Sequence, residues 1–195
     1  MDVGTFLGGI QTVDLLLVLY FMAFFVLGFA QGTIRRLIGI ASILFSFFLA
    51  ANLYEPLGNF LSGNWTQFSK EYSFMIGFLV VFVGAAIVFA LIAQGWYKPT
   101  PLFEKARFVD EVIGGLLGML EAVLLFIIVI IILDSFFVIP GIPESGNELH
   151  FLRDFWVWMD AAQVTAFFRE SILPIFFTLF GLFVPDNIEQ IVSGS

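Results

Sequence analysis

The sequence contains no cysteine and only one histidine. The lack of cysteine excludes disulfides, thiol catalysis and zinc sites built from cysteine ligands. The single His150 does not make a metal site by itself, so we expect no metal and no cofactor. The motifs of zinc proteases, serine hydrolases, phosphate-binding loops and dinucleotide-binding folds are also missing. We therefore expect a protein that is not an enzyme.

Charged side chains are scarce and mostly acidic. They make up 12% of the residues, about half of the roughly 25% typical of globular domains. The net charge of −8 argues against nucleic acid as a partner, because phosphate binding requires clustered lysine and arginine. Residues 1–11 contain no basic side chain, so we expect no cleavable signal peptide.

What the chain has in abundance is apolar sequence, with 60% hydrophobic residues and a mean hydropathy of +1.02. Its apolar runs are each close to the roughly 20 residues that a helix needs to cross about 30 Å of hydrocarbon. A helix also satisfies its own backbone hydrogen bonds, as lipid requires. We predict an all-α integral membrane four-helix bundle within residues 1–136, surrounded by the lipid bilayer. The four runs cover residues 13–30, 37–53, 74–93 and 112–133.

The connections and the tail follow from the residues between and after these runs. The stretch 54–72 is predicted to be a loop, because it is rich in turn residues. These are Pro56, Gly58, Asn59, Gly63 and Asn64. Residues 137–195 are predicted to form a helical tail on the outer face. Within it, 148–170 has the composition of an interfacial amphipathic helix, and the short apolar stretch 172–184 favours a re-entrant or interfacial segment. The alternative is a fifth crossing that includes 164–171.

Basic residues gather in two of the connections, and this asymmetry predicts the orientation. Cytoplasmic loops carry the excess of lysine and arginine. Both termini and the tail are therefore predicted to lie outside the cytoplasm, with Asp14 and Asp134 as helix ends in the outer headgroup region. For the two arginines of the first turn, binding of anionic lipid is the alternative to simple anchoring. The predicted cytoplasmic anchors are Arg35, Arg36, Lys98, Lys105 and Arg107.

Small residues form stripes at helical spacing, and such stripes allow membrane helices to approach closely. They predict packing between helices, either within one subunit or between subunits of a homo-oligomer or a complex with other membrane proteins. Gly39 shares a helix face with Ser42 and Ser46. The predicted helix-packing glycines are Gly28, Gly32, Gly39, Gly114 and Gly118.

Glu121 is the most informative single residue, because it lies nine residues into the fourth run. A charge at that depth is costly, so such residues usually face the bundle interior or water. One hypothesis is a functional acid, which with Ser42 and Ser46 would line a polar path in an oligomeric channel or transport subunit. The other is a structural group, either protonated or paired. Its possible partners are Arg35, Arg36, Gln31 and Ser42.

Two of these patterns together resemble the CvpA (colicin V production protein) family of bacterial inner-membrane proteins. They are Asp14-Leu-Leu-Leu followed by Gly28-Phe29-x-x-Gly32-x-x-Arg35, and Asp110-x-x-x-Gly114-x-x-x-Gly118. One departure is Glu121, where family members often have an arginine. The resemblance implies a multi-pass inner-membrane protein that acts in peptide-toxin production or secretion, or in maintenance of the envelope. We therefore predict a non-enzymatic accessory or scaffold factor.

Overall fold

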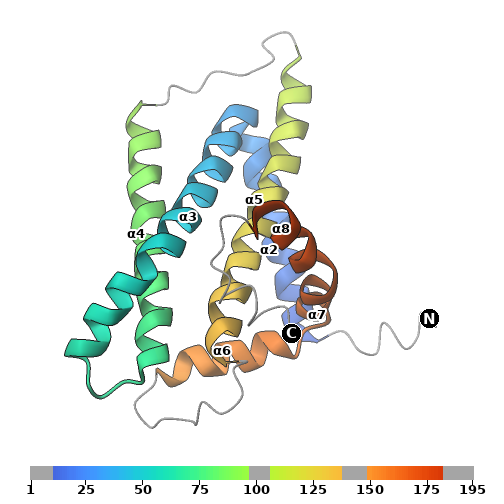
Figure 1. The fold of residues 1–195 in the computed structure, drawn as a ribbon. Helices are drawn as coiled ribbons and strands as arrows, with labels where there is room; N and C mark the ends of the chain where they lie inside the picture. Colours follow the sequence, from blue (N-terminus) through green and yellow to red (C-terminus); the bar gives the residue numbers. More distant parts are fainter. Residues whose placement is uncertain (1–10, 97–105, 138–148, 182–195) are drawn as a thin grey trace.

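The protein is all helical over the residues that the structure describes, which are 11–96, 106–137 and 149–181 (Figure 1). The structure is a computed structural model. Four of its helices are long and apolar enough to cross a membrane, which confirms the predicted all-α four-helix frame. These are α2 (Thr12–Gln31), α3 (Thr33–Asn64), α4 (Lys70–Trp96) and α5 (Arg107–Phe137). The tail forms α6 (His150–Asp160), α7 (Gln163–Phe167), a π-helical turn η1 (Phe168–Ile172) and α8 (Leu173–Phe180).

The four long helices pack in two pairs, α3 with α4 and α2 with α5, and α3 also packs against α5. Figure 1 shows α3 running obliquely across α4. Helix α5 is at the centre of the bundle. In its most apolar stretch of 18 residues 56% of the residues are buried, against 17% in the corresponding stretch of α2. The exposed apolar side chains of α2 therefore face the surroundings of the bundle, where lipid would lie. They are Leu15, Leu16, Val18, Leu19, Met22, Val26 and Leu27.

A single glycine makes the turn between α2 and α3. Gly32 has a φ of 77°, in the left-handed region that residues with a Cβ rarely adopt. Its N–H donates to the carbonyl oxygen of Gly28 at 3.0 Å and so closes the end of α2. The same residue is the N-cap of α3. The two helices are therefore joined with no intervening loop.

The prediction of a loop over 54–72 is wrong for most of its length, because α3 continues to Asn64. The polar residues of this stretch do not break the helix, since Asn64 and Ser62 bond to carbonyl oxygens of their own helix at 2.7 and 3.1 Å. Gly58 lies against Phe74 of α4, where an added Cβ would come within 2.8 Å of the ring. Packing on α4 thus overrides the turn preference of these residues.

The tail folds back onto the bundle. Helix α6 is shorter than the predicted amphipathic stretch 148–170, because the helix ends at Asp160 and a turn at Ala161 and Ala162 separates it from α7. Figure 1 shows α6 lying across one end of the bundle, and α7 and α8 running from there alongside α2 and α5. Ring contacts join Phe168 to Phe21 of α2 and Phe176 to Phe47 of α3, both with centroids 5.7 Å apart. The tail and the four-helix frame therefore share one apolar core.

Candidate functional site

The closest helix contact is made by glycines of α2 and α5. A Cβ added to Gly28 would lie 2.2 Å from the carbonyl oxygen of Gly114, and one added to Gly118 would lie 2.2 Å from that of Phe24. No side chain fits at such distances, so the backbones themselves are in contact. The glycine pair Gly28 and Gly32 and the pair Gly114 and Gly118, each spaced four residues apart, therefore meet within one chain.

Asp110 and Thr33 extend this contact to the α2–α3 turn. The Thr33 hydroxyl donates to the backbone carbonyl of Asp110 at 3.1 Å, and both residues are buried. A Cβ on Gly32 would lie 2.5 Å from the Asp110 carboxylate, so a glycine is needed here for space as well as for its φ. The residues of the second sequence pattern thus fix the turn that joins α2 to α3.

An ion pair inside the bundle lies one turn further along the same face of α5. Arg36 Nη1 donates to the Glu121 carboxylate, and their side chains are 7% and 14% exposed. Arg36, predicted to be a surface anchor, instead lies inside the bundle, because Glu121 provides the counter-charge that a buried guanidinium needs. Gly39 makes room for the carboxylate: a Cβ there would lie 2.7 Å from Glu121 Oε1. At Gly39 the close approach of α3 to α5 therefore accommodates the Glu121 side chain.

A cavity of about 390 Å³ lies beside this ion pair, between α3, α4 and α5. Its polar lining comes from the end of α2, from the first half of α3 and from Glu121 of α5, and its apolar lining comes from α3, α4 and α5. Ser42 is part of the wall, and its hydroxyl donates to the Ile38 carbonyl at 2.7 Å. Ser46, fully buried, donates to Ser42 O at 2.7 Å. The lining residues include Gln31, Arg35, Arg36, Ser42, Glu121, Ala86, Ala90 and Ala93.

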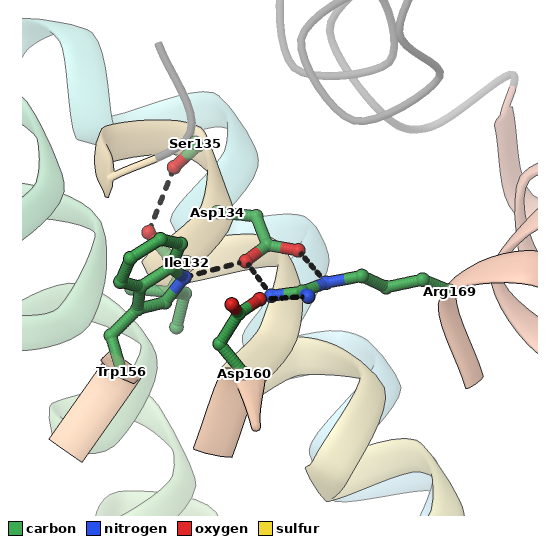
Figure 2. A network of polar contacts seen from close by, with 6 residues as sticks. All are labelled: Ile132, Asp134, Ser135, Trp156, Asp160 and Arg169. Carbon is green, nitrogen blue, oxygen red and sulfur yellow. Dashed lines mark hydrogen bonds and ion pairs between the residues drawn. The ribbon is translucent and has the colours of Figure 1, made fainter. Parts of the chain in front are cut away.

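Asp134, near the end of α5, is the centre of a second polar cluster (Figure 2). Its carboxylate accepts hydrogen bonds from Trp156 Nε1 at 2.9 Å and from Arg169 Nε and Nη2, both at 2.7 Å. Arg169 Nη1 also bonds to Asp160. Burial alone would lower the pKa of Arg169, but the hydrogen bonds and negative charges of the two aspartates outweigh it and raise that pKa above its ordinary value. Arg169 thus stays protonated and holds η1 to α5 and α6.

Asp14 connects the tail to α2. Its carboxylate accepts from the backbone N–H of Gln11 and of Val164, both at 2.9 Å. Asp14 and Asp134, predicted to lie in the headgroup region, are only 5% and 3% exposed. Each is covered by the tail near one end of its helix, and its depth at the lipid headgroups stays a prediction. The sequence feature that indicates this position of the tail is Arg169, because a basic residue beside an apolar segment requires an acidic partner.

Of the remaining predicted anchors, two are exposed on the surface and two lie outside the described residues. Arg35 is exposed at the start of α3. Arg107, exposed at the start of α5, bonds to Glu111 at 3.0 Å. Lys98 and Lys105 lie outside the described residues. Within the described ranges no three histidine, aspartate or glutamate side chains are placed to hold a metal ion.

Four apolar helices, closed by backbone contacts between glycines and by buried ion pairs, define a helical membrane protein. The sequence model of the family described as "Colicin V production protein" matches residues 13–173. The chain therefore belongs to the colicin V production protein family. No curated protein and no solved structure matches it. The matched region begins at Val13, extends through the four long helices and includes Arg169.

Proposed function

We propose that this protein is a non-enzymatic accessory or scaffold factor of the bacterial inner membrane, acting in secretion of a colicin V-like toxin or in maintenance of the envelope. Membership of the family supports the link to toxin production. The observation that carries the scaffold role is that charged side chains inside the bundle form ion pairs with each other. Glu121 is bonded to Arg36, and Asp134 to Arg169.

The serine face supports the same proposal. A transport path needs polar groups that are free to exchange partners with a moving ion or solute. The Ser42 and Ser46 hydroxyls instead bond to carbonyl oxygens one turn earlier in their own helix. The partners of this protein are then other membrane proteins or further copies of itself, which would bind along lipid-facing surfaces such as that of α2.

A complementation assay tests the proposal. In a toxin-producing strain that lacks this gene, we expect the wild-type chain and the Arg36→Gln/Glu121→Gln double variant to restore toxin secretion and envelope integrity equally. The double variant keeps the shape of the pair and removes both charges. Mild-detergent purification after crosslinking should recover a complex of defined mass. Loss of secretion with a normally folded double variant would contradict a purely structural pair.

The second candidate function is an oligomeric channel or transport subunit that uses Glu121 and the face of Ser42 and Ser46. The cavity beside the ion pair favours it, because a space with charged walls inside a membrane bundle is where a permeating species would bind. Ion or proton flux into liposomes containing the purified protein tests this function. Flux that Glu121→Gln abolishes would support the channel over the scaffold.

A further inference from the structure

We propose that the cavity between α3, α4 and α5 binds the phosphate group of an anionic membrane lipid, with Arg35 and Arg36 as its cationic ligands. The first observation is a buried donor with no partner. The Nε–H of Arg36 has no hydrogen-bond acceptor among the described residues, although the side chain is only 7% exposed. Buried donors are nearly always bonded, so an unpaired one in a residue that lines a cavity points to an acceptor beyond the described residues, and we assign that role to the lipid phosphate.

The start of α3 is a second, independent observation. The first backbone N–H groups of a helix have no partner within it and carry a partial positive charge. The N-cap of α3 is Gly32, which has no side chain, the Asp110 carboxylate of α5 lies against it, and the first turn of α3 contains no acidic residue. The turn instead carries Arg35 and Arg36, whose charges oppose the helix dipole. An anion bound in the cavity would be stabilised by both guanidinium groups, which line it.

The charge and size of the cavity indicate which anion fits. Arg35 and Arg36 carry two positive charges and Glu121 carries one negative charge, so the charged groups of the lining sum to +1. One phosphodiester, with a single negative charge, neutralises that sum. The volume of about 390 Å³ lies within the range of about 300–1,000 Å³ that small-molecule sites occupy.

The apolar part of the lining favours a lipid over free phosphate. Ala86, Ala90 and Ala93 recur along one side of α4, and Leu125 of α5 completes the wall with isoleucines of α3. Such a surface suits a glycerol backbone and the start of an acyl chain. The cavity also lies where α2 ends and α3 begins, and the ends of spanning helices are at the depth of lipid headgroups. By the predicted orientation this is the cytoplasmic leaflet.

Native mass spectrometry of the purified full chain in mild detergent tests the site. The probes are phosphatidylglycerol, zwitterionic phosphatidylcholine and inorganic phosphate. We expect phosphatidylglycerol to bind selectively and Arg35→Gln to weaken its binding about tenfold, the usual effect of losing one charge-assisted hydrogen bond. Glu121→Gln should tighten binding severalfold, because it removes the carboxylate that competes for Arg36. The matched control is Arg107→Gln, which removes an exposed positive charge outside the cavity.

Each other outcome overturns the proposal. Equal binding of phosphatidylcholine would show that the phosphate charge is not recognised. Binding of inorganic phosphate without phosphatidylglycerol would make the ligand a free anion. An equal loss in Arg35→Gln and Arg107→Gln would reveal a general charge effect. Should Glu121→Gln not fold, Arg35→Gln and its control decide the matter, because Arg35 is exposed and its replacement leaves no buried charge unpaired.

Discussion

At the residue scale, glycine is required at two points of α2 and α5 for space alone. Gly28→Ala and Gly118→Ala should each destabilise the protein by about 1–3 kcal/mol, the usual range for overpacking, because the new methyl group meets a backbone carbonyl that is not free to move. Thermal unfolding in detergent measures the effect.

Gly84→Ala is the matched control for this prediction. It lies in α4 with nothing within 4 Å of an added Cβ, so the gain in helix propensity should leave stability unchanged or slightly raised. A loss at Gly84 as large as the loss at Gly28 would mean that flexibility, and not contact, is what these glycines provide. Because the glycines meet within one chain, the damage should appear in folding before it appears in assembly.

The Arg36–Glu121 pair makes a second prediction at this scale. Removing one partner leaves the other charge buried without compensation, which typically costs about 3–5 kcal/mol. Arg36→Gln and Glu121→Gln should therefore each lower the unfolding temperature markedly, while the double variant should lose far less than the sum of the two. A double variant whose loss equals that sum would show that the two side chains do not interact.

At the scale of elements, Arg169 determines whether the tail stays on the bundle. Asp134 is 3% exposed and bonds to Trp156 and Arg169 in the cluster. Arg169→Gln leaves it with Trp156 alone, so η1 and α8 should separate from α5. Hydrogen-exchange mass spectrometry should show faster exchange in residues 163–180 and no change in α5. Arg107→Gln, which removes an exposed arginine that bonds to Glu111 of its own helix, should change neither segment. Slow exchange of α8 in Arg169→Gln would show that the phenylalanine contacts hold the tail by themselves.

How far the sequence predicts this fold depends on which force dominates each element. The four spans follow from apolar length, a local property that the sequence displays directly. The extension of α3 through Pro56 to Asn64 does not, because it depends on Gly58 and Gly77 packing against the facing helix. The place of the tail depends on Asp134 and Arg169, which are 35 residues apart along the chain. Nothing local to either one identifies its partner.

The candidate site shows the same division. The spacing of Gly28, Gly32, Gly114 and Gly118 predicts close helix packing. For Glu121 the sequence leaves open a functional acid and a structural group that is protonated or paired. Which of several basic or polar residues would pair with it was not decidable from spacing. The inward position of Arg36, beside the exposed Arg35, depends on the rotation of α3 that the turn at Gly32 sets.

At the scale of the whole molecule, the orientation is the prediction that most needs a direct measurement. Because the chain has no cysteine, single cysteines can be introduced without removing any. In intact cells, Thr66→Cys in the α3–α4 turn should react with a membrane-impermeant maleimide, and Arg107→Cys should react only after the membrane is permeabilised. The opposite pattern would place both termini in the cytoplasm.

The length of α3 has a consequence for the membranes in which this protein can reside. Its 32 residues measure about 48 Å at ~1.5 Å per residue. Even a tilt of about 40° uses only about 39 Å of helix to cross ~30 Å of hydrocarbon, so roughly six residues project past the acyl chains. A bilayer that thickens with growth temperature or lipid supply would draw on this reserve of helix. The four-helix bundle can then tolerate changes in bilayer thickness without repacking its helices.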